Sequence, residues 1–290
     1  MKNLTHSDTK LLALIGHPIK HSYSPFIQNT ALKFKDLDYI YLPFDVTKSN
    51  LKNAIKGMTV LGIRGFNVTI PHKENILELL QTVSEEASII GAVNTVVNDH
   101  GELNGYNTDS YGVTQTLLPY KKDISGQVVS LIGAGGAARA VIFSLIRNFK
   151  PKKINLINRT EQKAESLGNY FKDKMKFDSF TTLELFPPDL VETFRESKLI
   201  INATSIGMFP DNEDTVTDLK NSFNKNQIVF DVVYNPARTN LLKMAEKEGA
   251  VTLDGLTMLV HQASKSYELW TGEEMALEQV KNTLKYYIEN

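Results

Sequence analysis

A chain of 290 residues is long enough for about two domains with separate hydrophobic cores. Hydrophobic residues make up 42% of it and charged residues 22%, which is typical of globular proteins and argues against disorder and membrane spans. The absence of cysteine excludes disulfides, thiolate metal sites and cysteine nucleophiles, and a formal net charge of −1 with interspersed signs leaves no basic face for nucleic acid. The polar first ten residues lack the apolar core of a signal peptide, so we expect a cytoplasmic protein with a small-molecule partner.

The N-terminal part of the chain predicts an α/β unit. Apolar runs indicate strands at residues 11–16, 39–46 and 63–70, separated by helices that begin near residue 26 and cover 49–58. This alternation is typical of a parallel sheet. Two further segments, 94–97 and 103–109, flank a turn at 98–101 and predict a hairpin.

The loop after the first strand carries two serines, Ser22 and Ser24. A turn ahead of Pro25 would bring both hydroxyls around one bound group. Ser24 would alternatively cap the helix, with Pro25 at its first position. The pattern favours neither interpretation, so both stay open.

Polar side chains also follow the third strand. Asn67, Thr69 and Lys73 stand at its carboxyl end, where ligands collect in parallel sheets. Lys73 is interpreted either as a proton-transfer group or as a surface lysine in a first helical turn, although a cation is poorly placed at a helix N-terminus. Asp109 leads into the next predicted helix, so it is either a functional carboxylate or a helix cap.

The glycines that follow residues 129–132 predict a dinucleotide-binding turn between a strand and a helix. Gly133 permits the sharp turn, Gly135 permits close approach of a pyrophosphate, and a helix from Gly136 offers unpaired N–H groups. Ala138 takes the third fingerprint position, where close helix packing is the requirement. The alternative is a glycine turn without a ligand.

The next predicted strand, at residues 154–157, is followed by Arg159 rather than by an acidic residue. An acidic side chain at this place binds the ribose of NAD, whereas an arginine pairs with the 2′-phosphate of NADP. Lys163 would add positive charge, but Glu161 lies between the two and weakens the inference. An ordinary surface arginine is the alternative.

The rest of the second half continues the alternation after a domain boundary at residues 118–125. A strand and a short helix, separated by Pro187-Pro188, are expected within 177–196, and further strands within 199–208, at 228–233 and at 251–253. Helices are expected over 161–171, over 241–248, from Asp254-Gly255 through Trp270, and over 273–288. No metal site is expected, because the six histidines are scattered without ligand spacing, and His261 is interpreted as a helix histidine rather than a ligand.

Several motifs match one known family in the same order. They are Ser22-Tyr23-Ser24, Asn67-Val68-Thr69-Ile70-Pro71-His72-Lys73, Gly91-Ala92-Val93-Asn94-Thr95, Gly105-Tyr106-Asn107-Thr108-Asp109, Gly133-Ala134-Gly135-Gly136-Ala137, Asn158-Arg159-Thr160, Asn202-Ala203-Thr204, and Asp254-Gly255 with Gln262. The sequence resembles the shikimate dehydrogenases over essentially its whole length. Each motif alone is moderately specific, and together they are highly specific.

The resemblance implies two α/β domains with the active site in a cleft between them. A substrate-binding and catalytic domain would cover residues 1–118, and a Rossmann-like, doubly wound NADP-binding domain would cover 119–256. Helices from about 257 to 290 would pack back onto the N-terminal domain. The implied reaction is reversible hydride transfer between NADP and the ring carbinol of shikimate, which interconverts shikimate and 3-dehydroshikimate in aromatic amino acid biosynthesis.

The same resemblance implies the site residues. Lys73 and Asp109 match the catalytic pair, and a lysine beside a carboxylate suits transfer of the hydroxyl proton. The implied substrate-binding residues, all neutral and polar, are Ser22, Ser24, Thr69, Asn94, Tyr234 and Gln262. The implied cofactor-binding residues are Gly133, Ala134, Gly135, Gly136, Ala137, Asn158, Arg159, Thr160, Lys163, Val232 and Gly255.

Two alternatives remain at this point. The extra length at residues 172–195 resembles the quinate/shikimate branch, which accepts quinate and often uses NAD, and Glu161 beside Arg159 keeps NAD open as the cofactor. A catalytically silent sensor of a nucleotide or metabolite is the second alternative, but the presence of both Lys73 and Asp109 argues against it. A monomer or a homodimer is expected.

Overall fold

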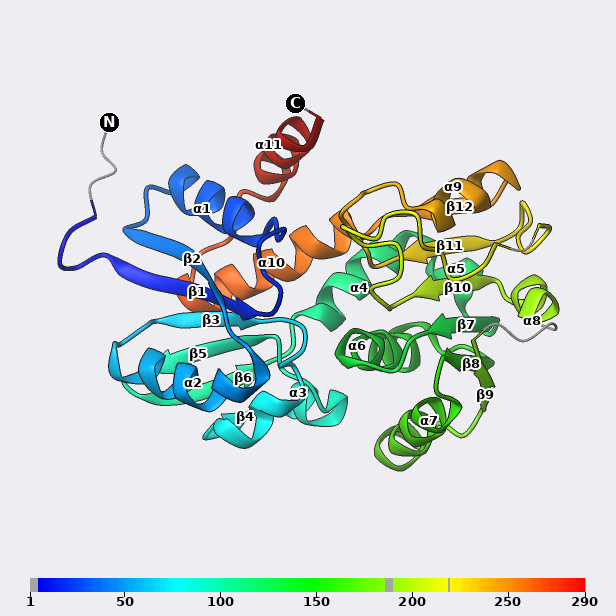
Figure 1. The fold of residues 1–290 in the computed structure, drawn as a ribbon, viewed down its shortest axis with the longest axis horizontal. Coiled ribbons are helices and arrows are strands. Elements are labelled where there is room, and N and C mark those ends of the chain that lie inside the picture. The colour runs from blue at the N-terminus through cyan, green and yellow to red at the C-terminus, as the bar shows by residue number, and fades with distance from the viewer. Residues whose placement is uncertain (1–4, 186–189, 219, 290) are drawn as a thin grey trace. The chain divides into compact units, whose positions relative to one another are not determined.

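The computed structural model describes residues 5–185, 190–218 and 220–289. The chain forms two compact units, one made of Met1–Thr108 with Val260–Asn290 and the other of Asp109–Leu259 (Figure 1). Each unit contains a six-stranded sheet, so the expected two-domain α/β fold is confirmed.

The sheet of the first unit is mixed rather than wholly parallel. Its strands are β1 (Lys10–Gly16), β2 (Tyr39–Asp45), β3 (Gly65–Val68), β4 (Thr82–Val83), β5 (Thr95–Asp99) and β6 (Glu102–Tyr106), in the order β2-β1-β3-β5-β6-β4. β1 pairs in parallel with β2 and β3, as predicted, but β5 runs antiparallel to both β3 and β6. The expected parallel pairing is thus confirmed for the three strands from which it was inferred, and the predicted hairpin adds to β3 in the opposite direction, which makes the whole sheet mixed.

The hairpin turns at His100 and Gly101, whose φ angles are 52° and 99°. Asp99 pairs with Glu102 on either side, so the loop has two residues and both adopt positive φ. Such a turn matches the right-handed twist of the strands. The hairpin therefore follows from local sequence.

The helices of the first unit are α1 (Ser24–Phe34), η1 (Lys48–Asn50), α2 (Leu51–Val60), η2 (Asn75–Leu79), α3 (Glu85–Ile90) and α11 (Leu277–Glu289). α1 begins at Ser24, and its N-cap is Tyr23, which makes no side-chain capping hydrogen bond. The interpretation of Ser24 as a helix cap is therefore wrong. Pro25 lies in the first turn, where its missing N–H costs nothing.

Helix α10 (Gly255–Thr271) begins in the second unit and ends in the first. There, Trp270 Nε1 donates to the Val96 carbonyl at 2.9 Å, and Gln28 Nε2 donates to the Ala263 carbonyl at 3.0 Å. The Tyr287 ring of α11 stacks on Phe26 of α1 with 4.2 Å between centroids. These contacts hold the last two helices on the first unit.

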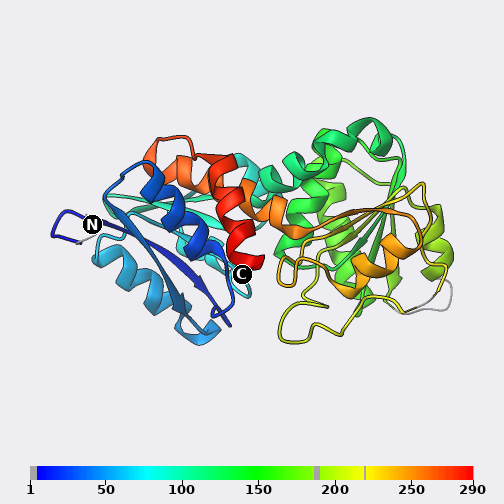
Figure 2. The ribbon, with the colours of Figure 1, turned by 90° about the horizontal axis from the view of Figure 1, so that it is seen from above.

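The sheet of the second unit is parallel throughout. Its strands are β7 (Val128–Ile132), β8 (Lys153–Asn158), β9 (Phe180–Glu184), β10 (Leu199–Asn202), β11 (Ile228–Asp231) and β12 (Val251–Leu253), in the order β12-β11-β10-β7-β8-β9. Helices cover both of its faces (Figure 2). This is the doubly wound order, in which the winding direction reverses between β7 and β10 and ligands bind beyond the carboxyl ends of the strands.

The helices of the second unit are α4 (Asp109–Leu117), η3 (Leu118–Tyr120), α5 (Lys121–Ile124), α6 (Gly136–Ser144), η4 (Leu145–Phe149), α7 (Glu161–Met175), α8 (Leu190–Glu196) and α9 (Asn240–Lys247). α4 belongs to this unit, so the units divide between Thr108 and Asp109, ahead of the expected position. α4 is joined to the second unit by a side-chain hydrogen bond, because Thr114 Oγ1 of α4 lies 2.8 Å from the Ser144 hydroxyl of α6. The predicted Pro187-Pro188 break lies outside the described residues.

Each unit has its own apolar core. In the first, Phe66 and Val96 of the sheet pack with Ile55 of α2. In the second, Val229 of β11 packs with Leu241 of α9. Burial of one such large apolar side chain contributes about 2 kcal/mol to the free energy of folding, so each sheet is a stable platform for the loops at its strand ends.

Candidate functional site

The first unit holds a buried network of neutral polar side chains near the junction of β3 and β5. Its centre is Asn67, whose Nδ2 donates to the Asn94 carbonyl at 3.0 Å and to Ser266 Oγ at 3.1 Å, and whose Oδ1 accepts from the Tyr41 hydroxyl at 2.8 Å. Thr95 Oγ1 lies 2.7 Å from Ser266 Oγ. Asn67 was among the predicted residues whereas Ser266 was not, because only the tertiary structure brings α10 onto β3.

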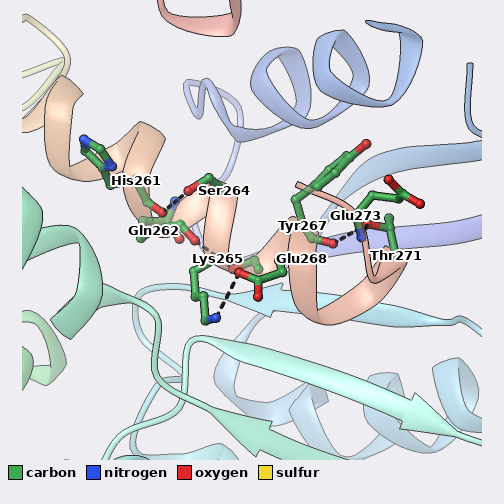
Figure 3. A network of polar contacts seen from close by, with 9 residues as sticks. His261, Gln262, Ser264, Lys265, Tyr267, Glu268, Thr271 and Glu273 are labelled. Carbon is green, nitrogen blue, oxygen red and sulfur yellow. Dashed lines mark hydrogen bonds and ion pairs between the residues drawn. The ribbon is translucent and has the colours of Figure 1, made fainter. Parts of the chain in front are cut away.

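The same network orients the amide groups of Asn94 and Gln262. Asn94 Oδ1 accepts from the backbone N–H of Thr108 at 2.7 Å, so Asn94 Nδ2 faces Thr108 Oγ1 at 2.9 Å and Gln262 Oε1 at 3.4 Å. Gln262 thereby turns its side-chain oxygen toward Asn94 and Thr108. Figure 3 shows this part of α10, where Gln262 lies one residue after His261.

The predicted lysine lies on a turn that is fixed by its backbone. The Lys73 carbonyl accepts from Val93 N at 2.8 Å, which places Lys73 beside the residue that precedes Asn94. His72 is fully buried, and its Nε2 donates to the Val46 carbonyl at 2.6 Å. Lys73 precedes η2 rather than standing in a first helical turn, and its side chain is half-buried, so its interpretation as a surface lysine of a helix is not supported.

The two predicted serines lie on a tight turn at the start of α1. Ser22 Oγ accepts from Ser24 N at 3.2 Å, and Ser24 is buried whereas Ser22 is half-buried. Thr69, on the neighbouring loop, is fixed by its N–H to the Ile15 carbonyl at 2.9 Å. The first unit holds most of the predicted catalytic and substrate-binding residues: Ser22, Ser24, Thr69, Lys73, Asn94 and Gln262. The second unit holds the other two, Asp109 and Tyr234.

The predicted glycine turn has the geometry that a phosphate requires. Gly133 follows β7 with φ of 114°, and a side chain there would lie 3.0 Å from the Ala203 carbonyl. Gly135 is the N-cap of α6, and a Cβ built on it would meet nothing within 4 Å. The open space at Gly135 and the N–H groups of the first turn of α6, from Gly136, fit the pyrophosphate of a dinucleotide.

The end of β8 presents the predicted arginine to solvent. Arg159 and Thr160 are exposed, and Asn158 Nδ2 donates to the Thr160 carbonyl at 2.9 Å, which shapes the turn into α7. Lys163 is also exposed in the first turn of α7. This arrangement leaves two cations at the carboxyl edge of the sheet, where a phosphate group would be accessible to them.

A buried carboxylate, Asp231, lies at the end of β11 and was not among the predicted site residues. Asp231 accepts from Asn202 Nδ2 at 2.9 Å, from Val233 N at 3.0 Å and from Thr239 Oγ1 at 2.7 Å. Burial raises the pKa of this carboxyl to about 6, and the hydrogen bond from Thr239 is the main opposing influence. An aspartate inside the apolar run 228–233 was the available signal.

The other predicted cofactor contacts in this unit are Val232 and Gly255. A Cβ on Gly255 would lie 2.3 Å from the Val232 carbonyl, so only glycine allows α10 to begin against this loop.

Burial lowers the pKa of His261, and the nearby Lys281 charge lowers it further. Among the described residues, no group of three or more His, Cys, Asp or Glu side chains is placed to hold a metal ion, and no helix is long and apolar enough to cross a membrane.

Comparisons with known proteins decide the family. Residues 14–96 match the family model of the shikimate dehydrogenase substrate binding domain, 116–256 that of shikimate / quinate 5-dehydrogenase, and 255–285 that of the shikimate 5'-dehydrogenase C-terminal domain. The shikimate dehydrogenase (NADP(+)) of Caldanaerobacter subterraneus is 45% identical over 275 residues, 92% of this chain and 93% of that protein. This chain belongs to the shikimate dehydrogenase family.

Solved structures of the family have the same fold. A crystal structure of shikimate dehydrogenase in complex with NADP+ superposes with a TM-score of 0.88 and 40% identity, covering 98% of each chain. Quinate dehydrogenase from Corynebacterium glutamicum in complex with NAD reaches a TM-score of 0.85 at 30% identity, covering 96% of this chain and 99% of that one. The resemblance of the motifs to shikimate dehydrogenases is therefore confirmed.

Proposed function

We propose that this protein is an NADP-dependent shikimate dehydrogenase, which interconverts 3-dehydroshikimate and shikimate by hydride transfer in aromatic amino acid biosynthesis. One observation carries the proposal: the Lys73 turn is bonded to Val93 directly before Asn94, whose amide belongs to a buried network of neutral hydrogen-bonding groups. The backbone of a potential proton carrier is thus bonded next to groups suited to hydroxyl recognition, which supports the proposal. The high identity to NADP-dependent relatives supports the same function.

The substrate is a small acid with several hydroxyls, and neutral side chains suit it. Ser22, Ser24, Thr69, Asn94, Tyr234 and Gln262 are proposed to bind its carboxylate and hydroxyls. Hydrogen-bonding sites of this kind reject analogues that lack a hydroxyl, because buried polar groups would then lose their partners. The fixed amide orientations of Asn94 and Gln262 support this role.

Lys73 and Asp109 are proposed as the catalytic pair. When bound, NADP would accept or supply the hydride at the ring carbon. Lys73 Nζ would take the hydroxyl proton in the oxidation and return it in the reduction, while the carboxylate of Asp109 balances the lysine charge. Both residues are needed for this proton transfer, which a sensor would not require.

NADP is proposed to bind the second unit at the carboxyl ends of β7, β8 and β11. The turn Gly133, Ala134, Gly135, Gly136 and Ala137 would hold the pyrophosphate. Arg159, assisted by Lys163, would pair with the 2′-phosphate, with Asn158 and Thr160 shaping that loop. Val232 and Gly255 would contact the remainder of the cofactor.

Initial rates with shikimate or quinate, each with NADP or NAD, test the function. We expect shikimate with NADP to give the highest kcat/KM of the four combinations. The likeness to a quinate dehydrogenase bound to NAD makes quinate with NAD the second candidate, and a clear preference for that pair would replace our proposal. Ligand binding without turnover of any pair would instead indicate a sensor.

The cytoplasm is proposed as the site of action, and a monomer or homodimer as the assembly. Fractionation of cells that express the tagged chain tests the location. Light scattering of the purified protein tests the assembly.

A further inference from the structure

Asp231 is an ionisable group that the proposed chemistry does not use. Its side chain is fully buried at the carboxyl end of β11, and its three described partners are all neutral. A buried carboxylate with neutral partners loses hydration that hydrogen bonds only partly replace. Its raised pKa of about 6 reflects that cost.

One oxygen of Asp231 is hydrogen-bonded to segment 202–204, which packs on the glycine turn. Asp231 Oδ1 accepts from Asn202 Nδ2, which also donates to the Ile206 carbonyl at 3.3 Å. The Asn202 amide thereby turns its own Oδ1 to Thr204, whose N–H and hydroxyl donate to it at 3.1 and 2.7 Å. Thr204 Cγ2 lies 3.1 Å from the position that a Cβ of Gly133 would occupy. Two hydrogen bonds and one close packing contact thus link the carboxylate to the glycine turn.

The same oxygen also holds the loop after β11. Asp231 Oδ1 accepts from Val233 N at 3.0 Å, while Val232 N donates to the Asn202 carbonyl at 3.0 Å. The Val232 carbonyl in turn packs against Gly255 at the start of α10. One carboxylate oxygen therefore accepts hydrogen bonds from two segments at the carboxyl ends of neighbouring strands.

We propose that Asp231 is a positioning residue for the dinucleotide, whose carboxylate holds segments 202–204 and 232–233 in the conformation that binds NADP. This role of Asp231 rests on the function proposed above, in which NADP is the cofactor. Well-packed apolar residues often replace buried charges without loss of stability, so stability alone does not explain a carboxylate here. Within the described residues, the hydrogen bond to the second oxygen comes from the Thr239 hydroxyl on the α9 side. Changing Thr239 therefore separates an effect on stability from an effect on NADP binding.

The test measures NADP+ binding by isothermal titration calorimetry and the melting temperature of the cofactor-free protein. Asp231→Asn removes the charge with little change of shape, and Asp231→Ala removes all three acceptor contacts. We expect Asp231→Asn to raise the Kd of NADP+ about tenfold, the effect of weakening charge-assisted hydrogen bonds. Its melting temperature at pH 7.5 should not fall, and the KM for shikimate should stay within about twofold.

Thr239→Val is the matched control. It breaks the bond to Asp231 Oδ2 and the N-cap of α9 but keeps the bonds to Asn202 and Val233. It should lower the melting temperature while the Kd of NADP+ stays within about twofold of wild type. Wild-type Kd values in both Asp231 variants, or equal weakening in Thr239→Val, would overturn the positioning role. Failure of the wild-type protein to bind NADP+ would instead reject the proposed function.

Discussion

The side-chain amide of Asn67 donates to the hydroxyl of Ser266 at 3.1 Å and so joins strand β3 to helix α10 across 199 positions of sequence. Ser266 Oγ also lies 3.0 Å from Thr108 Oγ1, and it donates to the carbonyl of Gln262 one turn earlier on the helix. The Ser266 hydroxyl therefore helps to hold Gln262 in position relative to the strand ends.

Replacement of Ser266 by alanine should weaken substrate binding. Loss of one hydrogen-bonding hydroxyl from a buried network costs about 1 kcal/mol, so the KM for shikimate should rise about fivefold while the KM for NADP stays unchanged. Ser264→Ala is the control, because the Ser264 hydroxyl donates only locally, to the His261 carbonyl of the same helix. Equal effects of the two variants in steady-state assays would contradict the role of Ser266.

Removal of either member of the proposed catalytic pair should affect turnover. Lys73→Ala and Asp109→Asn should each lower kcat about 100-fold or more, as expected for the loss of a positioned proton-transfer group. Lys52→Ala, on the exposed side of α2, serves as the control and should keep wild-type kcat. A wild-type kcat for either site variant, measured from initial rates of nicotinamide absorbance change, would show that the assigned pair is wrong.

Arg159→Ala should discriminate between the two nicotinamide cofactors. The guanidinium is proposed to pair with a phosphate that only NADP carries, so kcat/KM should fall about tenfold or more for NADP and change little for NAD. Arg147→Ala removes another exposed arginine from the same unit and should affect neither cofactor. Equal losses for NADP and NAD would refute the pairing.

The pKa of Asp231 predicts an unusual dependence of stability on pH. Because the carboxyl pKa is raised from 3.8 to about 6 by burial, the folded state binds this proton more tightly than the unfolded state. The stabilisation is fully present below about pH 4 and is lost as pH rises through 6. Lowering the pH from 7 to 5 should therefore raise the free energy of unfolding of the wild type, relative to Asp231→Asn, by about 1 kcal/mol.

Urea unfolding of both proteins at the two pH values provides the measurement. Asp123→Asn, which changes an exposed aspartate on α5, should show no such difference from wild type. The predicted linkage would be contradicted if the free energy of unfolding of the wild type, minus that of Asp231→Asn, failed to rise when the pH is lowered from 7 to 5.

Loss of the hydroxyl from two buried tyrosines should change the free energy of unfolding in opposite directions. Tyr267 is fully buried, and its hydroxyl has no hydrogen-bond partner within the described part of the chain, so Tyr267→Phe should stabilise the protein by about 1 kcal/mol. Tyr41 is equally buried, but its hydroxyl donates to Asn67, so Tyr41→Phe should destabilise it by a similar amount. Differential scanning calorimetry compares the two, and a lower melting temperature for Tyr267→Phe would falsify the first expectation.

Features that depend on neighbours in sequence were predictable. The glycine turn after β7, the hairpin at His100 and Gly101, and the parallel strands of the second unit follow from local residue preferences and from the hydrophobic pattern. The motifs also predicted the family correctly. The placement of Ser24 was not predictable in the same way, since capping and turn formation by serine have the same sequence pattern.

The sequence by itself determined the fold class, the family and the glycine turn of the second unit, because these depend on strand periodicity and on backbone angles that few residues adopt. Only the tertiary structure decided that β5 pairs antiparallel with β3, that Ser266 completes the network around Asn67, and that Asp231 joins Asn202 to Val233. The physical reason is that these hydrogen bonds join distant segments, whose partners are set by sheet order and helix packing rather than by the residues beside them.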